Sequence, residues 1–117
     1  MIKEIVTYHF DEKTKKEVYF VDEENRKQDK CIRYYFNGEI CEVYYFVDNT
    51  MQGDYKRYNP AGWIESNGEF VDGKKEGKWL KFNSDGSIRE IKFYIFGKEC
   101  DEQDYKKFIA RKRFNSF

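Results

Sequence analysis

The residue types that most often carry catalysis are sparse in this sequence of 117 residues. Its one histidine, His9, lies in a stretch that reads as a strand near the N-terminus. It lacks the serine or cysteine context of a nucleophile, so we interpret it as a packing or surface residue. The acidic side chains are scattered, and no two are placed as an acid–base couple. We therefore expect no catalytic residue, and a protein that is not an enzyme.

A glycine-rich stretch, GEFVDGKK from Gly68 to Lys75, spells most of a phosphate-binding loop. That motif needs a serine or threonine after its lysine and a helix behind it. Here Lys75 stands in the hydroxyl position, and the pattern that follows predicts another strand. We interpret Gly68 and Gly73 as turn residues of a β-structure.

The three cysteines, Cys31, Cys41 and Cys100, form an odd set without short-range pairs. We expect reduced thiols and no disulfide within the chain, as in a cytoplasmic protein. A structural zinc ion needs four clustered cysteine or histidine ligands, and the sequence has a single histidine. No metal and no cofactor are therefore expected.

Composition narrows the class of partner. Lys and Arg number 22, Asp and Glu also number 22, and aromatic residues make up 20% of the chain. A net charge of zero gives no general attraction to nucleic acid or to an anionic membrane, and neither is expected as the partner. No apolar run approaches the roughly 20 residues of a membrane span, and the N-terminus lacks a signal-peptide core. We expect a cytoplasmic location and no small-molecule substrate.

The strongest signal is a repeat of 24 residues. The aligned columns are Gly38, Gly62 and Gly86; Tyr34, Tyr58 and Phe82; Ile40, Ile64 and Ile88; Phe46, Phe70 and Tyr94; and Val47, Val71 and Ile95. Three copies cover residues 31–100, and residues 1–30 hold a degenerate copy without its glycines, as terminal repeats often do. Each copy predicts a β-hairpin that turns at its glycine and passes to the next copy near Asp48, Asp72 or Gly97. The chain is therefore expected to be one mainly all-β domain, an antiparallel meander of hairpins.

The C-terminal segment, residues 101–114, has a different pattern. Asp101 is placed to cap an amphipathic helix that begins with acidic residues and ends with basic ones. Its apolar side chains at helical spacing are Tyr105, Phe108 and Ile109. We expect the helix to lie over the last repeat and cover Ile91, Phe93 and Ile95. The basic stretch from Lys106 to Arg113 is interpreted as its solvated face, and contact with nucleic acid or phospholipid is the alternative.

These repeats resemble the MORN repeat family, in the bacterial variant known from YwqK-type antitoxins. The pattern stands as GDYKRYNPAGWIESNGEFVDGKKEG from Gly53 to Gly77 and as GKWLKFNSDGSIREIKFYIFGK from Gly77 to Lys98. The first copy keeps Asn37-Gly38 but has Asn49-Thr50 where the family has Gly-Lys. The resemblance implies an elongated antiparallel sheet that serves as an interaction surface. Relatives of this kind are antitoxins or immunity proteins, which neutralise a toxic enzyme by binding it, and other MORN proteins act at membranes.

Alternation along the strands places apolar columns on both faces, and a single sheet cannot bury both by itself. We therefore expect an aromatic-rich face to bind a protein partner such as a toxin or nuclease-like enzyme. The candidate partner-binding residues are Tyr44, Phe46, Tyr58, Trp63 and Phe70. The leading hypothesis is a non-catalytic inhibitor of the antitoxin, immunity or phage type. A structural or membrane-associated adaptor is the alternative, and self-association into a homo-oligomer stays open.

Overall fold

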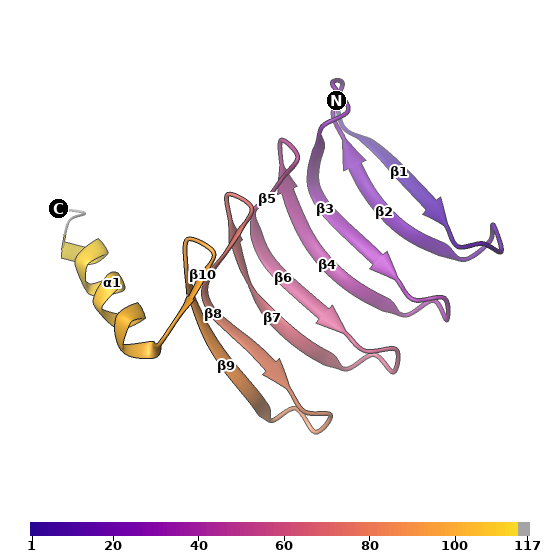
Figure 1. The fold of residues 1–117 in the computed structure, drawn as a ribbon. Coiled ribbons are helices and arrows are strands. Elements are labelled where there is room, and N and C mark those ends of the chain that lie inside the picture. The colour runs from indigo at the N-terminus through magenta and orange to yellow at the C-terminus, as the bar shows by residue number, and fades with distance from the viewer. Residues whose placement is uncertain (115–117) are drawn as a thin grey trace.

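The computed structural model describes residues 1–114 of the chain. The described residues form one antiparallel sheet of ten strands followed by a helix, so the predicted all-β hairpin meander is confirmed (Figure 1). The elements are β1 (Lys3–Tyr8), β2 (Lys15–Val21), β3 (Lys27–Tyr34), β4 (Ile40–Val47), β5 (Thr50–Met51), β6 (Gly53–Tyr58), β7 (Ile64–Val71), β8 (Lys74–Phe82), β9 (Ile88–Ile95), β10 (Lys98–Cys100) and α1 (Glu102–Phe114).

Each strand pairs with its neighbour in the sequence, in the order β1-β2-β3-β4-β6-β7-β8-β9-β10. The short β5 pairs with the end of β4 before the chain continues into β6. The sheet is a single layer, and the molecule measures 51 × 40 × 18 Å along its principal axes. Since residues 1–114 form no second sheet to cover it, both faces of the sheet depend on their own side chains for burial.

One row of turns lies at the predicted glycines. The amide N–H groups of Gly38 and Gly62 donate hydrogen bonds to the carbonyl oxygens of Tyr35 and Asn59, at 3.0 and 2.9 Å. Gly86 repeats the arrangement, and all three glycines have φ near +90°, a backbone conformation that costs glycine little. The predicted turns at these three positions are confirmed.

The second row of turns connects one repeat to the next. Two consecutive residues of positive φ occupy each turn: Asp48-Asn49, Asp72-Gly73 and Phe96-Gly97. Paired positive φ angles are the signature of a tight hairpin turn whose twist matches that of the strands. These positions also confirm the prediction made from the repeat.

Burial is low throughout the sheet. The buried apolar side chains among residues 1–114 are Val21, Cys31 and Trp79, of which Cys31 alone has no exposed surface. The chain exposes 8404 Å² of surface, whereas a compact monomer of 14.3 kDa exposes about 6,800 Å². The excess follows from the single layer, because most side chains have neighbours on the sheet and solvent above them.

The helix α1 begins as predicted, with the Asp101 carboxylate accepting a hydrogen bond from the Asp104 N–H at 2.8 Å. It packs on the face of β9 that carries Phe93, whose ring centroid lies 5.2 Å from that of Tyr105. The next contact along the helix joins Phe108 to Phe96. The expected cover over Ile91 is wrong: that side chain stays 43% exposed. The helix runs from Phe93 toward the turn at Phe96, whereas Ile91 lies the other way along β9.

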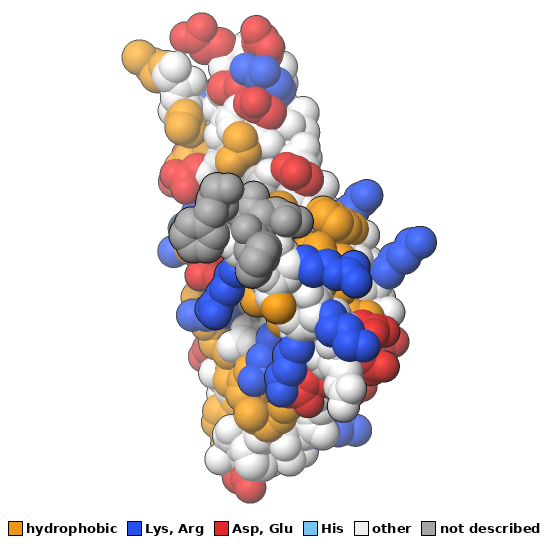
Figure 2. All heavy atoms as spheres, turned by 90° about the vertical axis from the view of Figure 1, so that its left-hand side faces the viewer, with side chains coloured by type: hydrophobic (Ala, Val, Ile, Leu, Met, Phe, Trp, Pro, Cys, Tyr) orange, Lys and Arg blue, Asp and Glu red, His pale blue; other side chains and the backbone are white. Residues whose placement is uncertain are grey.

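Basic side chains gather at the helix end of the molecule, as Figure 2 shows. On α1 the exposed ones are Lys106, Lys107, Arg111, Lys112 and Arg113. Within residues 1–114, no helix is long and apolar enough to cross a membrane.

Candidate protein-binding groove

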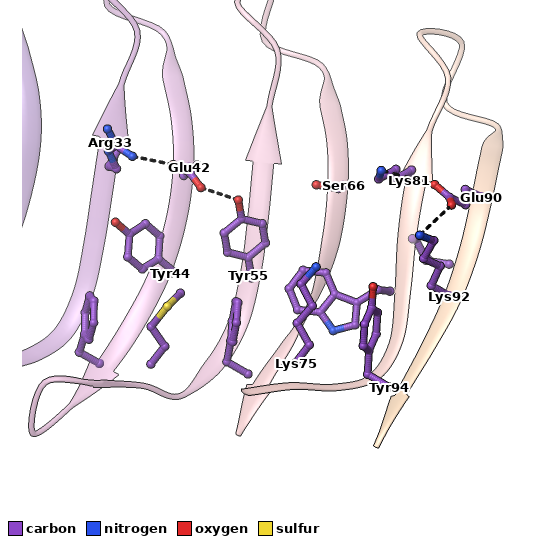
Figure 3. A pocket seen from close by; sticks show the side chains of 15 residues that line it. Arg33, Glu42, Tyr44, Tyr55, Ser66, Lys75, Lys81, Glu90, Lys92 and Tyr94 are labelled. Atoms are coloured by element: carbon purple, nitrogen blue, oxygen red, sulfur yellow. Dashed lines mark hydrogen bonds and ion pairs between the residues drawn. The ribbon is translucent and has the colours of Figure 1, made fainter. Parts of the chain in front are cut away.

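The face of the sheet opposite α1 is hollowed into a groove of about 560 Å³ that extends across β3 to β9 (Figure 3). Six aromatic side chains, here called the aromatic track, line it in a continuous series: Tyr44, Phe46, Tyr55, Phe70, Trp79 and Tyr94. Neighbouring rings of the track have centroids 5.1 to 6.3 Å apart, and most meet edge to face. This spacing and geometry are those of favourable aromatic pairs, so the track is a rigid apolar floor.

Two columns of the repeat supply five of the six track residues, all but Tyr44. Phe46, Phe70 and Tyr94 occupy the same position in three successive copies, on β4, β7 and β9. Tyr55 and Trp79 occupy a second shared position, on β6 and β8. Paired residues of neighbouring strands point to the same face, so the two columns interlock on the groove side.

Large residues on the track lie against small ones. Gly68 pairs with Tyr55 across the strands, and a Cβ atom placed on Gly68 would lie 2.1 Å from the Trp79 ring. The space that a side chain at position 68 would need is therefore filled by the indole. Gly68 lies inside β7, so our interpretation of it as a turn residue is wrong, whereas Gly73 is in a turn.

A large side chain also lies against a small one in the preceding repeat. Cys31 is the cross-strand partner of Tyr44 and has no exposed surface. Burial raises the pKa of the Cys31 thiol. Burial, and then its hydrogen bond with Cys31, raises the pKa of the Tyr44 phenol. Both groups are therefore held in their neutral forms on the groove face. All three cysteines are free thiols.

A charged row borders the track. Arg33 pairs with Glu42 at 3.2 Å, and Lys81 pairs with Glu90 at 3.4 Å, at the same position of two repeats (Figure 3). The Tyr55 hydroxyl donates a hydrogen bond to Glu42. Burial, followed by this hydrogen bond to Glu42, raises the pKa of Tyr55.

The middle repeat breaks the charged row. Arg57 stands opposite Ser66, where the other two repeats have a glutamate. Its guanidinium reaches instead to Glu42, at 3.7 Å, and to Glu65, at 3.3 Å. Glu42 is thus shared between Arg33 and Arg57.

Lys75 lies on the groove face at the opposite side of the track from the charged row. Its Nζ is 4.8 Å from the ring centroid of Trp79 and 5.0 Å from that of Tyr94. Lys27 makes the equivalent contacts two repeats earlier, with Tyr19 and Phe46. A cation over aromatic faces is attracted by the ring quadrupoles, so each ammonium group is held over its pair of rings.

The structure brings three of the five predicted binding residues to the groove: Tyr44, Phe46 and Phe70. Tyr58 does not line it; this residue ends β6, and its carbonyl oxygen accepts a hydrogen bond from Tyr35 at 2.6 Å. Trp63 does not line it either, because it lies in the loop before β7, with 52% of its surface exposed.

Sequence reasoning missed Tyr55, Trp79, Tyr94 and Lys75 as groove residues. A signal for Tyr55 and Trp79 was present, since they align in the repeat. Their common face follows from counting cross-strand partners, because Tyr55 opposes Gly68 and Trp79 opposes Lys92.

His9, which lies outside the groove, makes packing contacts. His9 Nε2 lies 3.1 Å from the carbonyl oxygen of Tyr34, and its ring meets the edge of Phe36. In the part of the chain that the structure describes, no three or more His, Cys, Asp or Glu side chains gather as metal ligands would.

Comparisons with protein-family models, with curated proteins and with solved structures gave no match to this chain.

Proposed function

We propose that this chain is a non-catalytic protein-binding repeat protein. Its groove binds the surface of a partner enzyme, and this binding neutralises the enzyme. The proposed class is that of an antitoxin, an immunity protein or a phage-type antagonist, which binds a nuclease-like enzyme. The proposed location of the chain is the cytoplasm. The observation that carries the proposal is the aromatic track: six contiguous rings on an open face of a one-layer sheet. Its likeness to MORN repeats adds support, because such repeats serve as interaction surfaces.

The area of the molecule supports a partner. The chain exposes 8404 Å², which exceeds the value for a compact monomer of this mass by about 1,600 Å². A stable protein interface covers about 800 Å² of each partner. A partner can therefore cover a full interface on one face of the sheet, and the chain would still expose as much surface as a compact monomer of its mass.

The construction of the track also favours binding. Trp79 is 9% exposed, and its ring fills the space over Gly68, so its side chain is held by close packing. Tyr44 is fixed by its contact with Cys31, and Tyr55 by its hydrogen bond to Glu42. Side chains that are already ordered lose little conformational freedom on binding, and aromatic anchors of this kind dominate many interfaces.

The groove's two carboxylates support a non-catalytic role. Glu42 contacts Arg33, Arg57 and Tyr55, and Glu90 contacts Lys81 and Lys92. The oxygens of both carboxylates are thus taken up by contacts within the chain. Both groups therefore serve to position cations.

The test begins with the full chain as bait in a lysate of its native host. The captured protein is purified, and its own enzymatic activity is then measured as the chain is added. Saturable inhibition at equal stoichiometry is expected. A captured enzyme whose activity is unchanged at saturation contradicts the inhibitor function.

One observation favours the alternative of a membrane-associated adaptor, namely the exposed basic residues of α1. Such residues are attracted to anionic headgroups by about 1 kcal/mol each near the surface. Sedimentation with vesicles rich in phosphatidylserine separates the two functions, because an inhibitor of the proposed kind stays in the supernatant.

A further inference from the structure

The groove carries more positive than negative charge, although the whole chain is neutral. The charged side chains that line it are Arg33, Lys75, Lys81 and Lys92 on the basic side and Glu42 and Glu90 on the acidic side. Both carboxylates are already engaged by cations of the chain. Glu17 and Glu99, which lie outside the groove, also pair with Arg33 and Lys92, at 3.9 and 3.3 Å, so the positive charge left for an occupant of the groove is chiefly that of Lys75.

The charged row beside the track departs from the repeat pattern in its middle copy. Ser66 replaces the glutamate found at positions 42 and 90, so Arg57 has no carboxylate directly opposite it. Because Arg57 then shares Glu42 with Arg33, the charged row holds one carboxylate fewer than a regular repeat would supply.

Lys75 is the least neutralised of these cations. No ion pair joins it to a carboxylate of residues 1–114, and its ammonium lies over the rings of Trp79 and Tyr94. The same region holds a second donor without a partner. Trp79 is 9% exposed, and its Nε1–H is buried without an acceptor among the described residues. Buried N–H donors are nearly always satisfied in folded proteins, so this place lacks an acceptor.

We propose that the groove binds an acidic segment of its protein partner, in which an aspartate or glutamate stands beside apolar side chains. The carboxylate pairs with Lys75 and brings acceptor oxygens to the end of the track where the Trp79 N–H lies. The apolar neighbours of that carboxylate pack on the aromatic track. This inference rests on the proposed function, and it names the chemistry of the partner surface.

The mixture of charge and apolar surface favours a protein over a nucleic acid. Aromatic side chains that bind single strands present their faces to the bases, whereas the rings of this track turn mostly toward one another, edge to face. Glu42 and Glu90 also lie in the groove and would repel phosphates. An acidic peptide segment needs one or two cations and an apolar floor, and the groove supplies both.

The experiment selects random linear peptides displayed on phage against the full chain, and then measures the binding of each selected peptide to the folded Phe70→Ala variant. Enrichment of Asp and Glu next to apolar residues is expected. Removing the charge in Lys75→Gln should weaken the selected peptides about tenfold, because a charge-assisted hydrogen bond is lost. Lys75→Arg should restore most of the affinity. Lys78→Gln is the matched control, since Lys78 lies on β8 but pairs with Phe93 on the opposite face.

The outcomes separate the two proposals. Selected peptides that are neutral or basic, yet depend on Phe70, would overturn the acidic partner and leave the binding function in place. Peptides that bind equally to Phe70→Ala would show that the groove is not the interface, which contradicts the proposed function itself. Displacement of the selected peptides by oligothymidylate, in a manner that requires Lys75, would assign the groove to nucleic acid instead.

Discussion

At the scale of single residues, the groove is built by exchanging large and small side chains at repeated positions. Tyr44 covers Cys31 in the β3–β4 hairpin. Trp79 on β8 fills the space over Gly68 on the neighbouring strand β7. The repeat fixes where a side chain points, and the departures from the repeat decide what the groove can bind. Lys75, Ser66 and Gly68 are such departures, so they give this chain its individual surface.

The Cys31 thiol provides a test of packing at this scale. Because it has no exposed surface and a raised pKa, it should react with a thiol reagent far more slowly than Cys41 and Cys100, which are partly exposed. Stopped-flow labelling of the native protein should show two faster thiols and one slow thiol. Three equal rates, with the protein folded by circular dichroism, would contradict the burial of Cys31. In unfolded protein without reductant, all three thiols should react.

The phenols of Tyr44 and Tyr55 predict a loss of stability in alkali. Burial raises both pKa values above the ordinary value, so the folded state holds these protons more tightly than the unfolded state. Their contribution is therefore fully present below the unfolded pKa of about 10 and is lost as pH rises through the folded values. Urea unfolding across this range should show a free energy of unfolding that falls more gently in the Tyr44→Phe, Tyr55→Phe double variant.

The control for this titration is Tyr8→Phe, which removes a phenol that is 50% exposed. It should leave the alkaline slope close to that of the unchanged protein. A double variant at Tyr44 and Tyr55 that lost stability as steeply as the unchanged protein would refute the assignment of those two groups.

At the scale of the elements, the hairpins were predictable because their signals are local. Gly38, Gly62 and Gly86 mark one row of turns, and the Asp72-Gly73 pair marks the other, since positive φ angles favour these residues. The helix start was also predictable, because Asp101 caps it within a few residues.

What the sequence could not predict depends on contacts between strands. The register of the β6–β7 pair shifts between Arg57 and Tyr58, so alternation cannot be counted through that point. Tyr58 is a candidate because it belongs to an aromatic column of the repeat, and that column does not show that the residue ends β6 outside the groove. The space above Gly68 is filled by Trp79 from the next hairpin, which no local pattern reveals. The direction of α1, and therefore the exposure of Ile91, also depends on tertiary packing.

Gly68 gives the element-scale prediction. Its substitution by alanine should lower the free energy of unfolding by about 1–3 kcal/mol, because the added Cβ forces Trp79 out of its position. The cost should shrink in a Trp79→Leu background, where the smaller side chain leaves room. Urea unfolding of the four proteins measures this difference. Ser66→Ala, on the same strand and face, is the control. An equal cost in both backgrounds would show that Trp79 is not what fills the space.

At the scale of the whole molecule, the single layer explains how structure and proposed function are connected. The molecule extends only 18 Å along its shortest principal axis, and α1 covers one face of the sheet at the β9 end. The other face carries the groove, and no described element lies over it. Each hairpin contacts chiefly its neighbours, so the sheet can offer a long, rigid surface without a two-layer core. Such a surface suits recognition of a protein.

The most direct test of the central claim is a calorimetric titration of the purified partner against paired variants of the chain. Tyr44→Ala with Phe70→Ala should weaken binding by about 2 kcal/mol or more, because the two aromatic anchors of the groove are lost. Tyr45→Ala with Val71→Ala, on the opposite face, should leave the affinity unchanged. Circular dichroism confirms that both variants are folded. An unchanged affinity in the groove variant, or an equal loss in the opposite-face variant, would contradict binding through the aromatic track.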